Sequence, residues 1–328
     1  MTELNTKNNE AIYASAARAM ALYNNLLSKE KLERLALTSD FSEEARILSE
    51  AGYNARKDSS DVEKSLSEML KDTYSLLDEL FKDFPKASEV LKLKYDCHNI
   101  KSAIKCRFAN RDVNSLMIDV GVIPASDVIE AIANKDVRNL PENMGKAALE
   151  AIEAYAAAPD PKLIDTKLDI ACFADMTKAA EECGFDFPKA YTALQIDLAN
   201  ILIKIRSSKL IKNPKKAAGF IIPGGKITFT GLECDKFIEK LKYTEYGKLA
   251  DAICECGTSD ISAVERFCRD CEADVIKKTA YMNDACADVY GYIIRRENEI
   301  KNVRIIMSCK KSKLDKDTVF SRLRIGLV

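Results

Sequence analysis

Apolar residues along most of the chain recur at intervals of three and four, the spacing of one face of an α-helix. Stretches that alternate apolar and polar residues, as a half-buried strand does, are few. The spacing, with Ser, Pro and Gly at its breaks, predicts helices over 11–27, 31–37, 42–51, 60–81, 87–108, 126–134, 141–157, 161–183, 188–209, 232–242, 245–256, 262–272 and 273–309. The expected fold class is therefore all-α.

One segment departs from this pattern. Residues 219–230 have the composition of a strand, and their centre, Pro223-Gly224-Gly225, is a turn signal. We interpret the segment as a structured linker between helices.

An internal repeat is the strongest pattern in the sequence. The five residues Asp83-Phe-Pro-Lys-Ala87 recur letter for letter at 186–190, and each copy leads into a predicted helix. Each helix carries an acid and an asparagine three residues apart: Asp96 with Asn99, Asp197 with Asn200, and, in a weaker third copy, Glu299 with Asn302. The asparagines are nearly evenly spaced and the apolar stripes around them superpose, although Arg296 has replaced one apolar position of the third copy. We therefore predict three related helical units at 1–115, 116–213 and 214–328.

The acid and the asparagine of each copy are neighbours on the helix surface. Counted at 3.6 residues per turn, the acid is expected at the edge of the buried face and the asparagine further toward solvent. One interpretation is a structural hydrogen bond or cap to an adjoining helix, copied when the unit was duplicated. The other is a surface that holds a partner. Acid–base catalysis would need a second carboxylate nearby, which the spacing does not supply.

The balance of charges, the short uncharged stretches and the first residues argue against a nucleic-acid-binding, a membrane-spanning and a secreted protein. Fifty basic residues against fifty-one acidic ones give no general electrostatic attraction for nucleic acid. The longest stretch without a charged residue, Ala19–Ser28, is about half of the twenty residues that a membrane helix needs. The first residues have neither the basic nor the apolar region of a signal peptide. We expect a soluble protein at the cytoplasmic side, without a transmembrane segment.

Candidate chemistry is sparse. The eleven cysteines are expected to be reduced thiols, and the single histidine, His98, is expected at a helix–helix contact. Cys254, Cys256, Cys268 and Cys271 allow a four-thiolate zinc site, although cysteines within helices are commonly small buried residues. A nucleotide-binding loop of the Gly-x4-Gly-Lys-Ser/Thr type is absent. The sequence predicts no catalytic, cofactor-binding or metal site.

Several stretches, in order along the chain, resemble one known family, the C subunits of V-type (archaeal and bacterial A/V-type) ATPases, which are similar to the d subunit of the eukaryotic V-ATPase. The stretches are the opening segment from Tyr13 to Tyr53, the helix Lys94-Tyr-Asp-Cys-His-Asn-Ile-Lys101, the second such helix at 196–201, the Pro-Gly-Gly linker at 220–225, and Arg295-Arg-Glu-Asn-Glu-Ile-Lys-Asn-Val-Arg304. Cys97 departs from the pattern, because the family more often has an aromatic residue there.

The resemblance implies a funnel-shaped protein with pseudo-threefold symmetry and no catalytic role. It implies a peripheral position on the cytoplasmic face of the membrane, where the protein would join the central shaft, made of the D and F subunits, to the proteolipid ring during ion transport. We hypothesise that Lys101, Arg206 and Arg304, near the ends of the repeated helices, contact the shaft or the ring. The coupling ion, H⁺ or Na⁺, and the direction of ATP turnover stay open. The alternatives are a soluble helical-repeat adaptor, which zinc could stabilise, and, third, a helical-bundle enzyme that uses carboxylates.

Overall fold

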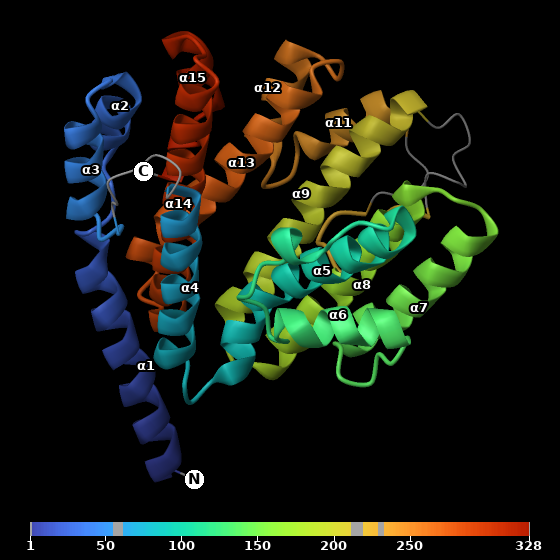
Figure 1. Cartoon of the computed structure of the whole chain (residues 1–328). Helices are drawn as coiled ribbons and strands as arrows, with labels where there is room; N and C mark the ends of the chain where they lie inside the picture. Colours follow the sequence, from blue (N-terminus) through green and yellow to red (C-terminus); the bar gives the residue numbers. More distant parts are fainter. Residues whose placement is uncertain (1, 55–61, 211–218, 229–232, 328) are drawn as a thin grey trace. The chain divides into compact units, whose positions relative to one another are not determined.

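The computed structural model describes residues 2–54, 62–210, 219–228 and 233–327, and within these ranges the chain forms helices and turns but no strand (Figure 1). The prediction of an all-α fold is confirmed. The chain divides into two compact units. The first unit combines residues 1–83 with residues 272–328, and the second unit consists of residues 84–271.

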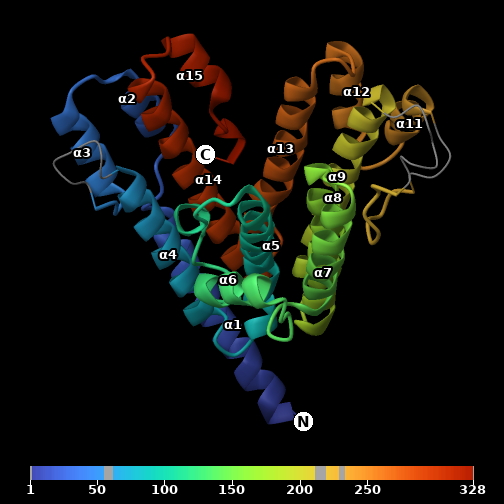
Figure 2. The same cartoon turned by 45° about the vertical axis from the view of Figure 1, so that its right-hand side comes forward.

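The first unit is organised around one long buried helix, α14. Its helices are α1 (Thr2–Tyr23), α2 (Lys29–Leu37), α3 (Phe41–Glu50), α4 (Val62–Leu80), α14 (Ala285–Lys311) and α15 (Lys316–Arg322). Helix α14 contacts α1, α2, α4 and α15. Ile293, Val303 and Ile306 of α14 are completely buried, as is Leu77 of α4. Helices from both ends of the sequence therefore share one core, as the blue and red ribbons in Figure 2 show.

The second unit is organised around α8. Its helices are α5 (Pro85–Ala109), α6 (Ala125–Asn134), α7 (Glu142–Ala157), α8 (Pro161–Glu182), α9 (Asp186–Leu210), α11 (Cys234–Leu241), α12 (Gly247–Cys256) and the first part of α13 (Ile261–Lys278). Helix α8 packs against α5, α7 and α9. Leu168 and Ile164 of α8 are completely buried in these contacts.

Side chains at the helix ends explain where many helices begin and end. The carboxylates of Asp160, Asp284 and Asp315 accept hydrogen bonds from backbone N–H groups in the first turns of α8, α14 and α15. Asn110 and Lys135 adopt left-handed backbone angles where α5 and α6 end.

Three predictions about secondary structure need correction. The break predicted between residues 272 and 273 is wrong, because α13 continues to Lys278 and a short 3-10 turn, Thr279–Tyr281, follows it. The actual break is made by Asn283, whose φ is 49°, and by the capping Asp284. Helix α1 ends at Tyr23 rather than at residue 27, and α15 was not predicted.

The linker interpretation is confirmed where the structure describes it. Residues 219–228 run as turns without strand pairing, and residues 229–230 lie outside the described residues. Within the described part of the chain, no helix is long and apolar enough to cross a membrane.

Helix pairs recur along the chain in the order that the sequence repeat predicts. The pairs α4–α5, α8–α9 and α13–α14 begin at Val62, Pro161 and Ile261, which are nearly evenly spaced. The second helix of each pair carries the repeated acid and asparagine. The two compact units do not follow these pairs, because the units are defined by contacts in the folded chain and the pairs by repeated sequence. The division into three units stays a prediction.

Candidate functional site

The repeated acid and asparagine side chains are buried in all three copies. The exposed fractions of Asp96, Asn99, Asp197, Asn200, Glu299 and Asn302 lie between 0 and 3%. The expectation that the acids lie at the edge of the buried face and the asparagines nearer to solvent is therefore wrong. In each copy, backbone from another part of the chain covers this part of the helix.

In the first copy, the covering segment is residues 118–123, which we call the first strap. The side-chain amide of Asn99 pairs with the backbone of Ile118 through two hydrogen bonds: Nδ2 donates to the Ile118 carbonyl and Oδ1 accepts from its N–H, both at 2.9 Å. The Asp96 carboxylate accepts from the N–H groups of Val122 and Ile123, at 2.9 and 3.1 Å. Two adjacent side chains of α5 thus hold both ends of the strap.

The second copy repeats this arrangement in the same register. The second strap is residues 222–227. Asn200 makes both hydrogen bonds with the backbone of Ile222, each at 2.8 Å, and Asp197 accepts from Lys226 and Ile227, each at 3.1 Å. The hydroxyl of Tyr246 also donates to Asp197, at 3.0 Å. The repeat therefore includes the strap as well as the helix.

A glycine lies at the same position of both straps. A Cβ atom placed on Gly121 would lie 2.1 Å from Oδ1 of Asp96, and one on Gly225 would lie 2.2 Å from Oδ1 of Asp197. Real Cβ atoms do not approach other atoms so closely. Both glycines are therefore required by the close approach of the strap to the carboxylate.

The third copy keeps the asparagine contact and changes the acid contact. Asn302 pairs with the backbone of Arg324, donating at 3.2 Å and accepting at 2.7 Å. Glu299 accepts hydrogen bonds from the N–H of Leu27 and, at 2.7 Å, from the hydroxyl of Tyr53. Arg296 Nη1 lies 2.6 Å from Glu299 Oε1. The longer glutamate reaches the N-terminal part of the chain and forms a buried ion pair there.

Burial changes the acidity of the strap carboxylates. It raises the pKa of Asp96 from 3.8 to about 6, although the N–H groups of Val122 and Ile123 and the charge of Lys92 act in the opposite direction. Burial also raises the pKa of Asp197, against the same kind of backbone hydrogen bonds. Compared with the unfolded chain, the folded state therefore shifts each carboxyl group toward its protonated form.

Asp96→Asn is expected to flatten the dependence of stability on pH. A raised native pKa means that the stability linked to Asp96 is fully present below about pH 3.8 and is lost as pH rises through about 6. A shift of roughly two units corresponds to about 3 kcal/mol. Urea unfolding followed by circular dichroism at pH 4 and pH 7 measures the difference for wild type and variant.

Glu142→Gln is the matched control for this prediction. Ion pairs with Lys146 and Lys178 lower the pKa of Glu142 from 4.5 to about 2, so stability linked to Glu142 is present above about pH 4.5 and is lost as pH falls, the opposite sign to Asp96. Glu142→Gln should therefore not flatten the loss of stability between pH 4 and pH 7. Parallel profiles for Asp96→Asn and wild type would show that Asp96 does not titrate in this range.

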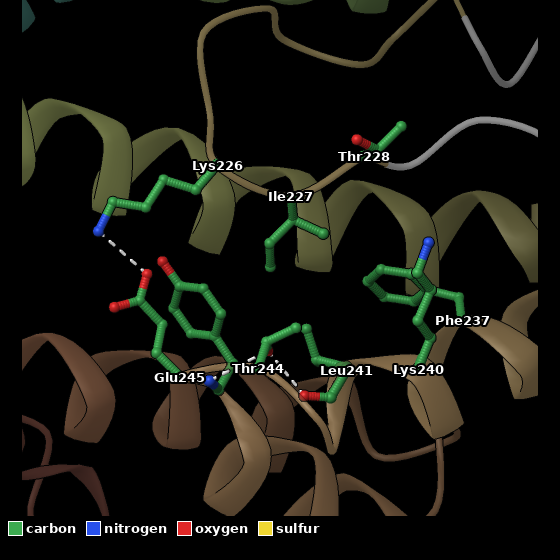
Figure 3. Close-up of a pocket in the computed structure, with 9 residues that line it drawn as sticks. Lys226, Ile227, Thr228, Phe237, Lys240, Leu241, Thr244 and Glu245 are labelled. Carbon is green, nitrogen blue, oxygen red and sulfur yellow. Dashed lines mark hydrogen bonds and ion pairs between the residues drawn. The ribbon is translucent and has the colours of Figure 1, made fainter.

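A pocket adjoins the second strap. Its volume is about 320 Å³, and its walls include Ile227, Phe237, Leu241 and Tyr246. Figure 3 shows Lys226 reaching across to Glu245, and their charged groups lie 3.1 Å apart. The volume is at the lower end of the range for ligand pockets. Among the described residues, the charged groups that line the pocket are two lysines and Glu245, so no two described carboxylates of the lining come together for acid–base work.

The three cations proposed as partner contacts each have an acidic neighbour on another helix. Lys101 lies 2.5 Å from Asp169 of α8, Arg206 pairs with Glu265 of α13, and Arg304 lies 2.8 Å from Glu63 of α4. Arg206, Arg304 and their partners remain partly exposed, whereas the Lys101 side chain is largely buried. These contacts fix the positions of the cations, and a role toward a partner stays a prediction.

The remaining candidate residues lie elsewhere. His98 is exposed, and its Nε2 lies 3.0 Å from the carbonyl of Leu116, so the helix that it contacts is the short 3-10 helix Asn114–Leu116. Within the described residues, which include Cys254, Cys256, Cys268 and Cys271, no three His, Cys, Asp or Glu side chains gather as a metal site would require. The four-cysteine zinc site is therefore not formed there.

Sequence reasoning missed the groups that complete the straps. Gly121 and Tyr246 were not singled out, and Gly225 was interpreted only as part of a turn. Tyr53 and Arg296 were not expected to meet Glu299. The carboxylates of the first two copies each accept two backbone N–H groups, and buried, hydrogen-bonded networks of this kind rigidify a fold.

Comparisons with known proteins match most of the chain to one family. A family model described as ATP synthase (C/AC39) subunit matches residues 15–322. The C subunits of several A-type ATP synthases are similar to the chain: that of Thermococcus kodakarensis is 23% identical over 319 residues, covering 89% of this chain and 84% of that protein. That of Methanosarcina mazei is 23% identical over 341 residues, covering 97% and 94%.

Proposed function

Because the chain belongs to the ATP synthase (C/AC39) subunit family and is thus part of a rotary ATP synthase, we propose that it is the non-catalytic component that couples the rotating shaft to the membrane ring. The observation that carries the proposal is the family match over residues 15–322, nearly the whole chain. The partners we propose are the D and F subunits of the shaft and the proteolipid ring, with the protein held peripherally on the cytoplasmic face of the membrane.

The straps support a mechanical role. An element that transmits torque must keep its helices fixed while load passes through them. Asn99 and Asn200 each tie a long helix to a later segment by two backbone hydrogen bonds, and the neighbouring aspartates add two more. Opening a buried strap would leave these groups without partners, at a cost of about 1–3 kcal/mol for each group. The straps therefore oppose bending of α5 and α9.

The surface charge supports contacts that form and release. The chain carries 50 basic and 51 acidic residues, so charges of both signs are available to a partner. Polar and charged residues at the rim are typical of non-obligate interfaces between proteins. Arg206 and Arg304 are partly exposed at helix surfaces, where an acidic group of a partner can reach them.

Affinity capture from native membranes tests the proposal. Tagged protein is recovered after gentle solubilisation, and the associated proteins are identified by mass spectrometry. Recovery of shaft and ring proteins is the expected result. Recovery of soluble proteins only, while the ring is demonstrably present in the extract, would contradict the coupling role and favour a helical-repeat adaptor.

Reversing the charge of Arg206 is expected to weaken capture of the shaft or ring. Arg206→Glu alone also breaks the ion pair with Glu265, so the informative variant combines it with Glu265→Arg, which restores the pair in reverse. If Arg206 contacts a partner, the double variant should still bind that partner roughly twofold to fivefold more weakly than wild type does. This is the loss of affinity expected when one exposed ion pair is removed. The ratio of captured shaft and ring proteins to bait measures the effect.

The exposed pair of Asp136 and Arg138 supplies the control, because its reversal alters an equivalent ion pair outside the proposed contacts. Full recovery of capture by the Arg206→Glu/Glu265→Arg variant would show that Arg206 acts only within the chain. The same design applies to Lys101 with Asp169 and to Arg304 with Glu63.

A further inference from the structure

Three sulfur atoms meet in the core of the second unit, between α5 and α8. Cys97 of α5 and Cys172 of α8 each reach a backbone carbonyl that lies one turn before the other cysteine. The thioether of Met176, one turn further along α8, lies 3.9 Å from the sulfur of Cys172. All three side chains are 4 to 5% exposed. This sulfur cluster has no part in the straps.

The two cysteines are held by a reciprocal arrangement of the helices. The Cys97 thiol donates to the carbonyl of Leu168, at 3.5 Å, and the Cys172 thiol donates to the carbonyl of Leu93, at 3.7 Å. Each acceptor lies one turn before the other cysteine on the opposite helix. Since α5 and α8 pack closely, the backbone on both sides fixes the two sulfur atoms in positions facing each other.

We propose that Cys97, Cys172 and Met176 form a binding site for a soft monovalent metal ion, Cu(I). Thiolates and thioethers select Cu(I) over harder ions. Structural zinc takes four ligands from Cys, His, Asp or Glu, and this cluster offers two such ligands. The donor set therefore favours Cu(I) over zinc.

The charges at the site fit this ion. Binding displaces one proton from each thiol, so two thiols and Cu(I) give a bis-thiolate complex with one negative charge and two protons released to solvent. Lys101 lies one turn after Cys97 on α5, and its ammonium pairs with Asp169 of α8 at 2.5 Å. It supplies a positive charge beside the complex in a buried setting, where an uncompensated charge is costly.

Titration of the reduced full-length protein with Cu(I), under anaerobic conditions and against a chromophoric Cu(I) chelator, tests the site. The wild-type protein is expected to remove one more equivalent of Cu(I) from the chelator than the Cys172→Ser or Cys97→Ser variant does. Cys106→Ser is the matched control: Cys106 is also a buried cysteine of α5 that donates to a backbone carbonyl, at 3.8 Å from Asp112 O, and its variant should retain the extra equivalent. Incubation before each reading allows for local opening of the buried site.

Met176→Leu keeps the side-chain volume and removes the thioether. This variant should still bind the additional equivalent of Cu(I), but with an affinity for Cu(I) that is lowered about tenfold, as expected when a metal site is weakened without being lost. X-ray absorption should show a shell of three sulfur atoms in wild type and two in Met176→Leu. The same equivalents and affinities in wild type, Cys172→Ser and Met176→Leu would overturn the proposal. Should the cysteine variants fail to fold, as judged by circular dichroism, Met176→Leu alone decides it.

Discussion

Gly225→Ala is expected to lower the free energy of unfolding by about 3 kcal/mol, more than glycine-to-alanine changes normally do. The added Cβ atom would lie 2.2 Å from Oδ1 of Asp197 and 3.1 Å from both Cγ of Asp197 and Cγ2 of Ile196. The second strap must therefore move away from α9, which weakens the hydrogen bonds of Lys226 and Ile227 to the carboxylate. Urea unfolding followed by circular dichroism measures the loss.

Two controls isolate the steric cause. Gly184→Ala has nothing within 4 Å of its added Cβ but a φ of +82°, so it reports backbone strain alone and should cost about 1–2 kcal/mol. In an Asp197→Ala background the carboxylate is gone, and Gly225→Ala should then cost much less than in wild type. Equal costs in the two backgrounds would show that contact with Asp197 is not the reason for the glycine.

Glu299→Gln is expected to destabilise the first unit by about 3–5 kcal/mol, the cost of breaking one side of a buried ion pair. Arg296 and Glu299 have side chains only 5% and 3% exposed, and the glutamate also accepts from Leu27 and Tyr53. The substitution keeps the shape of the side chain but leaves the Arg296 cation buried without its counter-ion. Chemical unfolding monitored by circular dichroism gives the change in stability.

The control for this prediction is an exposed ion pair that involves the same helix, α14. Arg304 pairs with Glu63 at an exposed site, so Glu63→Gln should change stability by less than about 1 kcal/mol. Similar losses for Glu299→Gln and Glu63→Gln would contradict the view that burial makes the first pair important.

The sequence predicted the helices well because their signals are local. Apolar periodicity located them, and prolines such as Pro85 and Pro161 mark first turns. The break before α14 was misplaced although its signal was present: Asn283 tolerates the left-handed conformation and Asp284 caps the next helix.

The site was only half predictable, because helical geometry says nothing about what covers a helix. The acid and the asparagine were found from the repeat, but in the first two copies their burial depends on backbone that returns to the helix 19 to 30 residues later. A signal for the straps did exist: Ile118-x-x-Gly121-x-Ile123 and Ile222-x-x-Gly225-x-Ile227 share one pattern. In the third copy, Leu27 and Tyr53 have no such pattern, so their contact with Glu299 required the structure.

The first unit is built from both ends of the sequence, and this affects how the protein folds during synthesis. Helix α1 packs mainly against α14, which the ribosome makes more than two hundred residues later. At synthesis rates of about 5–20 residues per second, α14 is made at least ten seconds after α1, and until then Ile12 and Ala19 lack the helix that buries them. The continuous second unit, residues 84–271, is complete before then. A released chain truncated just before residue 285 should therefore hold a folded second unit and an N-terminal helix that is open to chaperones.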